Sequence, residues 1–413
     1  MKYGFVVDCG NAYPLWVLGP DHYAAWLSSQ GTIIQNQLKA IQFKGEPGHY
    51  AALFNTDGQL DGFVVVVDLS DPLWCLAGLV AKLPVQDYQL TDLTHSLDVE
   101  LALLGWALAH YQFNCYKTTK DAQCLPRLSI DTAQFSAIEP IVESVFEVRD
   151  LINTPTNDLG PAELCQAVQK LASQYHAEIN ETVGQDLLNR QLNAIWAVGA
   201  AGSQPPRLIE LAWGDPSHTS VVLIGKGVCF DTGGLDIKSS AGMRLMKKDM
   251  GGAAHVLGLA RLIMAYQLPI YLRVLIPAVE NNIAANAYRP GDVIQMANGS
   301  TVEVGNTDAE GRLVVADAFT VAKQYQPELL IDFTTLTGAA RVALGPSVAV
   351  MFSNDDVVAQ SLQQCSEQVV DPLWRLPLVA DYKRYLKSDI ADQSNISKVP
   401  YGGAITAALF LQS

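Results

Sequence analysis

The 413-residue sequence has few charged residues, and the charge it carries does not suit a polyanionic partner. Charged residues make up 17% of the chain, and 27 basic against 42 acidic side chains leave a net charge of −15. Such an acidic surface repels phosphate backbones and anionic lipid, which argues against nucleic-acid and membrane-surface binding. No stretch approaches the roughly 18 consecutive apolar residues of a membrane span. We therefore expect no membrane segment and no nucleic-acid partner.

Cysteine pairs and a secretory leader are also missing. The seven cysteines are scattered, odd in number and without a CxxC pair, which indicates reduced thiols. The N-terminal stretch has Lys2 and then Asp8 and Pro14, unlike the basic end, apolar run and cleavage site of a signal peptide. These features predict a cytoplasmic protein.

Several familiar catalytic motifs do not occur. Gly225-Lys226 is followed by Gly227 instead of Ser or Thr, so the segment is not a phosphate-binding P-loop, and the third glycine of a dinucleotide-binding fingerprint is missing. The sequence has no HExxH, no GxSxG, and no pair of histidines at metal-ligand spacing. These absences exclude the common nucleotide-binding, zincin and serine-hydrolase arrangements.

The residues that are present favour a large α/β protein. Hydrophobic residues make up 49% of the chain, and its length suits two or three domains. In the first part, the apolar pattern predicts a strand and two helices, at 63–69, 101–110 and 137–152. Later, strands alternate with helices, which is typical of a mostly parallel sheet, with strands at 220–225, 270–279 and 329–333 and helices at 161–174, 252–267 and 313–324. An Asn-Gly turn at 298–299 predicts a hairpin.

The fold class that follows is α/β, with a smaller N-terminal α/β domain joined by a helix to a C-terminal catalytic α/β domain with a mostly parallel central sheet. We place the N-terminal domain at residues 1–130, the linker helix at 131–155 and the catalytic domain at 156–413. The N-terminal domain offers no cluster of residues that suggests chemistry.

Four acids follow apolar strands of the second domain, namely Asp231, Asp249, Asp308 and Glu310. An Asp-x-Glu alone is most often a solvated turn. These acids lie among glycines just after buried strands, however, and buried carboxylates are costly unless they are paired or bound to metal. Hard oxygen ligands suit Mg, Mn or Zn, and two dications would cancel the four charges. Lys238 and Arg312 would then remain as positive charges for an anionic transition state.

Longer motifs around these acids resemble the leucine aminopeptidase (cytosol aminopeptidase) family of dinuclear metallopeptidases. The family signature is matched in full by Asn306-Thr307-Asp308-Ala309-Glu310-Gly311-Arg312-Leu313. Further matches occur in the same order as in the family, at 149–155, 226–238, 246–252, 335–339 and 402–408. The resemblance covers residues 140 to 413, whereas the first 130 residues resemble the family only in position.

The resemblance implies a metal-dependent aminopeptidase that hydrolyses the N-terminal residue of peptides with a free amine. It implies two divalent ions, first Mn or Zn with Mg or Co as alternatives, whose ligands are Lys226, Asp231, Asp249, Asp308 and Glu310. Lys238 would polarise the scissile carbonyl, and Arg312 would hold a bicarbonate. The pocket for an apolar first residue, Leu or Met, would be lined by Met246, Asn306, Thr335 and Gly338. The family also implies a homohexamer.

Two other functions are less consistent with the sequence, and the sequence departs from the family at one point. Some family members bind DNA without using peptidase activity, but the net charge of −15 argues against this here. An inactive scaffold would have lost Lys238, Arg312 or the carboxylates, and all are present. Family members usually continue beyond the segment after Gly402 into a strand that borders the pocket, whereas this sequence stops at Ser413. We therefore expect a truncated C-terminus or a pocket open on that side.

Overall fold

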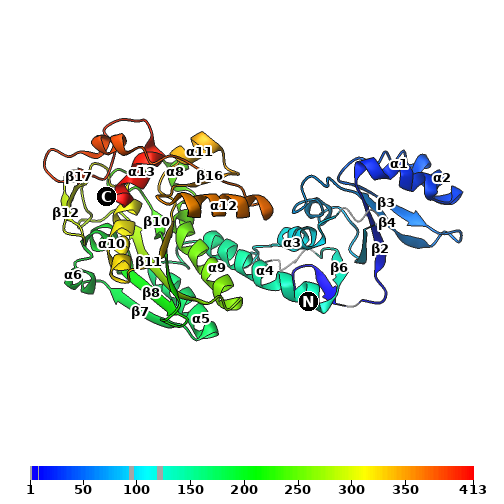
Figure 1. The fold of residues 1–413 in the computed structure, drawn as a ribbon, viewed down its shortest axis with the longest axis horizontal. Helices are drawn as coiled ribbons and strands as arrows, with labels where there is room; N and C mark the ends of the chain where they lie inside the picture. The colour runs from blue at the N-terminus through cyan, green and yellow to red at the C-terminus, as the bar shows by residue number, and fades with distance from the viewer. Residues whose placement is uncertain (1, 8, 93–96, 119–123) are drawn as a thin grey trace. The chain divides into compact units, whose positions relative to one another are not determined.

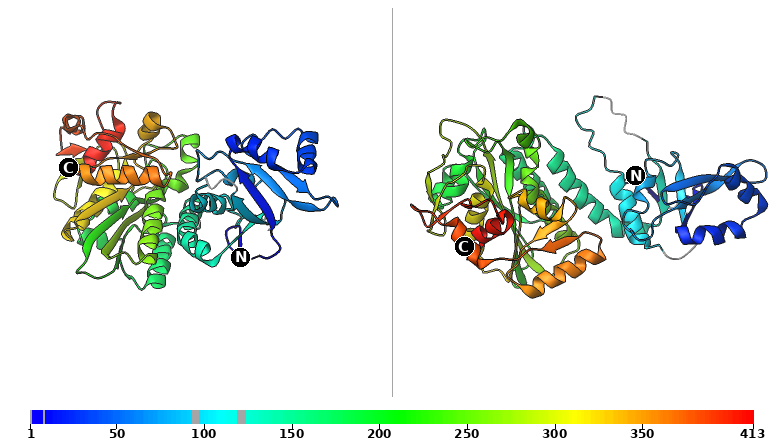
Figure 2. Two further views of the ribbon diagram at one scale, coloured as in Figure 1. Left: turned by 45° about the vertical axis from the view of Figure 1, so that its right-hand side comes forward. Right: turned by 90° about the horizontal axis from the view of Figure 1, so that it is seen from above.

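The computed structural model describes residues 2–7, 9–92, 97–118 and 124–413. Figures 1 and 2 show that each of its two compact units contains a sheet with helices packed on it. One unit comprises residues 1–146 and 368–370, and the other comprises 147–367 and 371–413. The boundary falls inside α4 (Thr132–Asn153), which contains the helix predicted over 137–152. The domain limits at residues 130 and 156 stay a prediction.

The N-terminal unit is built on a six-stranded sheet in the order β1-β6-β5-β2-β4-β3. All neighbouring strands are parallel except the antiparallel pair β3 and β4. The strand predicted over 63–69 is β4, which starts earlier because Leu60 already pairs with Phe54. The strands are β1 (Phe5–Val7), β2 (Tyr13–Leu18), β3 (His49–Phe54), β4 (Leu60–Val66), β5 (Asp87–Asp92) and β6 (Arg127–Ile130).

Alternation along these strands supplies two separate apolar faces. Leu15 and Val17 of β2 contribute to the core beneath α3 (Val99–Ala109). Leu18 contributes to the core beneath α1 (Pro20–Ser29) and α2 (Thr32–Ala40). The helix predicted over 101–110 is α3, which Asp98 caps by accepting a hydrogen bond from the amide of Leu101.

The second unit has a mixed sheet with a parallel centre, in the order β14-β9-β11-β8-β7. Strand β11 is parallel to β9, and β9 is parallel to β14, whereas β8 is antiparallel to both β11 and β7. Strand β10 pairs in parallel with the second half of β11. The strands are β7 (Glu178–Val183), β8 (Arg207–Trp213), β9 (Thr219–Gly225), β10 (Gly227–Asp231), β11 (Ile270–Asn281) and β14 (Leu329–Phe333). The predicted fold class is confirmed.

Helices cover both faces of this sheet, so the unit has three layers (Figure 1). Val221 and Leu223 of β9 face the core formed with α5 (Pro161–Tyr175) and α9 (Gly251–Ala265). Val222 and Ile224 face the core formed with α7 (Asn193–Gly199), α10 (Glu310–Gln324) and α13 (Gly403–Gln412). Apolar side chains that point both ways explain why β9 is a continuous hydrophobic run.

Shorter elements complete the second unit. The predicted hairpin is present as the antiparallel pair β12 (Val293–Gln295) and β13 (Thr301–Glu303), and β17 (Gln393–Ser394) adds to β13 in parallel. The remaining elements of the chain are α6 (Asp186–Asn189), α8 (Ser240–Met243), α11 (Ala339–Leu344), α12 (Asp356–Gln368), β15 (Ala349–Met351), β16 (Leu373–Arg375), η1 (Ala77–Leu79), η2 (Met246–Met250) and η3 (Ala380–Leu386). Within the described part of the chain, no helix has the length and apolarity needed to cross a membrane.

Candidate active site

Lys226 sits at the point where three elements of the central layer meet. It lies between the end of β9 and the start of β10; its amide donates to the carbonyl of Phe333 at 3.0 Å, and its carbonyl accepts from the amide of Ala253 at 2.8 Å. This close approach of α9 to the strands requires Gly252, because a Cβ there would lie 2.0 Å from the Phe333 carbonyl oxygen. Lys226 is consequently only 2% exposed.

Two lysines each span a pair of carboxylates. Nζ of Lys226 lies 2.7 Å from Asp249 Oδ2 and 2.8 Å from Glu310 Oε1. Nζ of Lys238 lies 2.9 Å from Asp231 Oδ2 and also contacts Oδ1 of Asp308. The structure thus brings together the five residues predicted as metal ligands and one of the two predicted as catalytic.

Three of the carboxylates converge on one small volume. Asp231, Asp308 and Glu310 each offer an oxygen, and these oxygens lie within 4.8 Å of one another. Asp231 ends β10 and Glu310 begins α10, with Asp308 in the turn just before that helix. Convergent carboxylate oxygens at the ends of strands are the donor set that hard divalent cations prefer.

Burial dominates the electrostatics of the cluster. It raises the pKa of Glu310 to about 8, against the opposing effect of the Lys226 ammonium. Burial also raises the pKa of Asp308, because its effect is larger than the opposing effect of Lys238. Burial by itself would lower the pKa of Lys226, but the charges of Asp249 and Glu310 outweigh it, so this pKa is raised. Two ammonium groups only half compensate four carboxylates, so the cluster favours additional positive charge.

Neighbouring groups hold the carboxylates in place by hydrogen bonds. Oδ1 of Asp231 accepts from the side chain of Asn281 and the amide of Gly233, both at 2.8 Å. Oδ1 of Asp249 accepts from the Thr335 hydroxyl at 2.7 Å. Oδ2 of Asp249 is buried and receives no hydrogen bond of regular geometry from the described residues, although the Lys226 ammonium is close. A carboxylate that is oriented by a hydroxyl and whose second oxygen has only an ammonium beside it fits a metal ligand.

Arg312, the second residue predicted as catalytic, lies apart from the ion pairs. It is 8% exposed, and its Nη1 donates to the carbonyl of Asn395 at 2.7 Å. The centre of its guanidinium lies 5.9 Å from the ring centroid of Phe410 in α13. Burial lowers its pKa to about 10, so the guanidinium remains charged at neutral pH.

Two of the four predicted pocket residues contact members of the cluster. Thr335 donates to Asp249, and Oδ1 of Asn306 accepts from the amide of Asp308 at 2.7 Å. Met246 begins η2, the short helix that also carries Asp249, and Gly338 directly precedes α11. Their role in a substrate pocket stays a prediction.

Comparison with known protein families identifies the family to which this chain belongs. Residues 147–413 match the family described as "Cytosol aminopeptidase family, catalytic domain". The chain belongs to this family. Residues 13–129 match the "M17 aminopeptidase, N-terminal domain", so the first part of the chain resembles the cytosol aminopeptidases in sequence as well as in position. The resemblance inferred from the motifs is confirmed, and the chain is a metallo-exopeptidase of the aminopeptidase type.

Similarity to individual proteins supports this assignment. The chain is 42% identical over 322 residues to a probable cytosol aminopeptidase of Acinetobacter baylyi, covering 76% of this chain and 67% of that protein. The crystal structure of the cytosol aminopeptidase from Coxiella burnetii is similar with a TM-score of 0.94 and 46% identity, covering 99% of this chain and 89% of the other. The bottromycin maturation enzyme BotP in complex with Mn gives a TM-score of 0.83 and 30% identity, covering 97% and 89%.

The structure adds three supporting residues that the sequence did not reveal. Asn281 ends β11 at the edge where Asp231 ends β10, and its Nδ2 also donates to the carbonyl of Thr307 at 3.0 Å. Tyr288 donates to the same carbonyl at 2.5 Å. Asn281 could have been found from its place at a strand end, as Asp231 was. The third residue, Asn395, carried no such signal.

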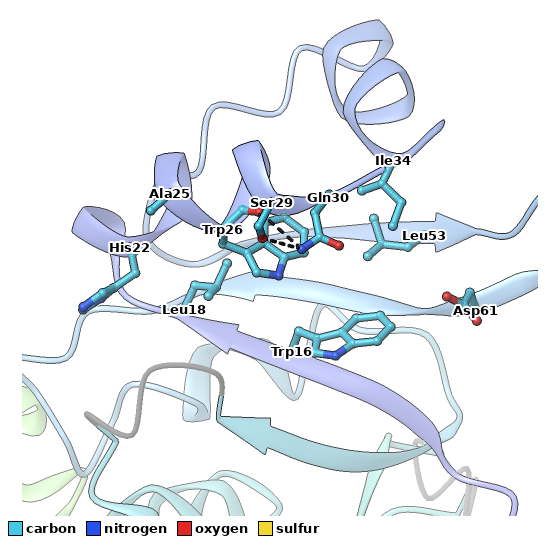
Figure 3. Close-up of a pocket in the computed structure, with 10 residues that line it drawn as sticks. All are labelled: Trp16, Leu18, His22, Ala25, Trp26, Ser29, Gln30, Ile34, Leu53 and Asp61. Carbon is cyan, nitrogen blue, oxygen red and sulfur yellow. Dashed lines mark hydrogen bonds between the residues drawn. The ribbon is translucent and has the colours of Figure 1, made fainter. Parts of the chain in front are cut away.

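A hollow of about 560 Å³ lies in the N-terminal unit and does not include the carboxylates (Figure 3). It lies between α1 and the sheet, with the indoles of Trp16 and Trp26 on its walls and Asp61 at one end. None of its lining residues belongs to the cluster around Lys226. The hollow therefore does not alter the assignment of the chemistry to the second unit.

Proposed function

We propose that this cytosol aminopeptidase removes the N-terminal residue, preferably Leu-like or Met-like, from peptides with a free α-amine, using two divalent metal ions. The observation that carries the proposal is that four carboxylates, three of them buried and Asp308 half-buried, converge in two pairs, each already spanned by a cationic group. One pair is Asp249 and Glu310 with Lys226, and the other is Asp231 and Asp308 with Lys238.

The donor set divides naturally between two cation sites. Lys226, Asp231, Asp249 and Glu310 would form one site, and Asp231, Asp308 and Glu310 the other, so that Asp231 and Glu310 belong to both. When bound, divalent cations supply Lewis-acid activation of a water molecule and of the peptide carbonyl. Mn or Zn is the first choice and Mg or Co the alternative; the manganese complex of the similar BotP supports Mn.

The two remaining cationic side chains would stabilise negative charge on the peptide and on a bound anion. Lys238 has a 16% exposed side chain, which allows its ammonium to meet a peptide carbonyl and stabilise the negative charge that develops there. Arg312 has a buried planar guanidinium that is charged at neutral pH, which suits a bicarbonate ion. Met246, Asn306, Thr335 and Gly338 would line the pocket for an apolar first side chain.

The proposed assembly and location have support from the surface and from the relatives. We propose a homohexamer, which the strong exposure of the apolar side chains Val342 (89%) and Tyr401 (75%) supports, since buried interfaces use such groups. A cytoplasmic location is supported by the free thiols and by the similarity to proteins named cytosol aminopeptidases.

The deciding test is metal-dependent turnover. Metal-free protein is given Mn, Zn, Mg or Co separately and assayed on Leu-p-nitroanilide, with a Leu peptide in free and N-acetylated forms as the matched pair. We expect activity only with metal and only on the free amine. Anomalous scattering from Mn-soaked crystals should give two peaks per chain, and one peak or none would refute the two-ion site. The molar mass measured by light scattering should exceed the 44.7 kDa of a monomer.

A further inference from the structure

Asn395 is fully buried, and its side chain binds both ends of the segment 305–309, here called the signature loop. Its Oδ1 accepts from the amides of Gly305 at 2.8 Å and Asn306 at 3.3 Å. Its Nδ2 donates to the carbonyls of Asn306 at 2.7 Å and Ala309 at 3.3 Å. One carboxamide therefore uses both its acceptor and its donors on the backbone that carries Asp308.

The main chain of Asn395 binds two further parts of the same region. Its amide donates to the carbonyl of Glu303 at 3.0 Å, which continues the pairing of β17 with β13. Its carbonyl accepts from Nη1 of Arg312 at 2.7 Å. A single residue thus contacts the strand before the loop, the loop itself and the guanidinium after it.

Packing fixes Asn395 in this position. A Cβ on Gly305 would lie 2.6 Å from Cγ1 of Ile396, the residue that follows Asn395. The segment around Asn395 is therefore seated directly against the start of the loop, and Asn395 itself is 0% exposed. Its hydrogen bonds belong to a packed part of the fold and do not depend on a mobile surface side chain.

We propose that Asn395 is a positioning residue for the aminopeptidase reaction, holding Asp308, Glu310 and Arg312 in one fixed arrangement. This inference rests on the proposed function. Asn395 acts through Asn306, whose side chain accepts from the amide of Asp308, and through Ala309, which directly precedes Glu310. Partners that orient metal-binding carboxylates typically contribute about 10–100-fold in metal affinity or activity, and small misplacements of reacting groups cost about 10²-fold in rate.

Two substitutions separate the halves of the carboxamide. Asn395→Asp keeps an oxygen toward the amides of Gly305 and Asn306 but replaces the donor that faces the carbonyls of Asn306 and Ala309 with a second oxygen. Asn395→Ser keeps a small polar side chain that can bind only part of the loop. Both leave the backbone carbonyl of residue 395 available to Arg312.

Asp317→Asn is the matched control for a purely structural effect. Asp317 is also 0% exposed and accepts from three backbone amides, those of Ala194, Ile195 and Ala297. These amides belong to α7 and the β12–β13 turn and not to the signature loop. Loss of stability alone should therefore affect this variant in the same way as the variants of Asn395.

The experiment measures kcat and KM on Leu-p-nitroanilide with Mn, and Mn affinity by titration calorimetry, for the full chain and each variant. We expect Asn395→Ser and Asn395→Asp to lose about 10–100-fold in kcat or Mn affinity per folded molecule, and Asp317→Asn to keep both parameters whatever its effect on the melting temperature. If only one Asn395 variant folds, the kcat and Mn affinity of that variant decide whether Asn395 is a positioning residue. The role of Asn395 would be overturned if its variants keep kcat and Mn affinity within twofold of the wild type. It would also be overturned if Asp317→Asn loses as much kcat or Mn affinity as they do. An inactive wild type that binds no Mn would instead refute the proposed function.

Discussion

Nζ of Lys226 lies 2.7 Å from Oδ2 of Asp249, an oxygen that no described residue reaches with a regular hydrogen bond. Glu310 lies on another side of the same ammonium at 2.8 Å. The lysine is thus bound to the two acids with which it is proposed to share a metal ion. An ammonium has no free lone pair, so metal binding by Lys226 requires that its proton leaves.

Lys226→Arg separates a metal ligand from a structural cation. Arginine keeps the positive charge between Asp249 and Glu310 but does not lose its proton in proteins. We expect Lys226→Arg to lose one metal ion per chain and most of the activity, as Lys226→Met should. Metal content by atomic absorption, together with kcat, checks this. Full metal content and near-normal turnover in Lys226→Arg would show that the lysine only pairs with the acids.

Gly311→Ala should damage the site with little effect on the rest of the fold. A Cβ at residue 311 would lie 2.6 Å from both Cε and Nζ of Lys226, which is buried and has little room to move. We expect kcat/KM to fall about 10²-fold, as displaced catalytic groups generally cause. Gly78→Ala is the control, because no atom lies within 4 Å of a Cβ placed there. Equal kinetics for the two variants would contradict the packing argument.

Thr335 is predicted to line the substrate pocket, and the structure also shows that it orients Asp249. Thr335→Val removes the hydroxyl that donates to Oδ1 of Asp249 at 2.7 Å, whereas Thr335→Ser keeps the hydroxyl and removes the methyl group. We expect the valine variant to lose about 10-fold or more in kcat or metal affinity. The serine variant should mainly change the ratio of KM for Leu substrates to KM for Met substrates. Steady-state kinetics on both substrates test this, and equal kcat losses would argue against separate roles.

Asp317 should make the folded protein less stable as the pH rises toward neutrality. Burial raises its pKa from 3.8 to about 6, although three backbone amides favour the charged form. Because the folded protein holds this proton more tightly than the unfolded chain, the group's contribution is fully present below its unfolded pKa of 3.8 and is lost through about 6. The loss amounts to about 3 kcal/mol.

Denaturant unfolding of the wild type and Asp317→Asn over this pH range measures the effect. The amide does not titrate, so the difference in unfolding free energy between the two proteins should change between pH 4 and pH 7 and then remain constant. The wild type should be relatively more stable at the acidic end. A difference independent of pH would show that the pKa of Asp317 is the same in the folded and unfolded states.

The central layer of the second unit was predictable, and its antiparallel edge was not. Strands β9, β11 and β14 are apolar runs separated by helices, which is the pattern of parallel strands. Strand β8 contains Arg207 and Glu210, which do not suggest a buried strand in the sequence. They are compatible with burial because Arg207 pairs with Glu181 at 2.9 Å and Glu210 with Arg190 at 2.5 Å. Partners so distant in sequence are not visible in a local pattern.

A similar limit applies to the candidate site. Asp231 and Glu310 could be selected because they stand next to strand ends and glycines, and family motifs then supplied their proposed roles. Asn395 lies in no such motif, and its contacts are mostly with backbone atoms, for which the amino-acid types of the partners carry no information. The sequence therefore predicts the groups proposed to do chemistry better than the groups that hold them.

The distribution of the site along the chain has a consequence for synthesis of the protein. Lys226 lies at the centre of the second sheet, whereas Asn395 directly follows β17, much later in the chain. Domains fold as units once their long-range contacts can form. A nascent chain that has exposed only the segment up to Glu310 still lacks the residue that holds the signature loop. Peptidase activity should therefore begin only after the segment that carries Asn395 has also emerged and packed against the loop.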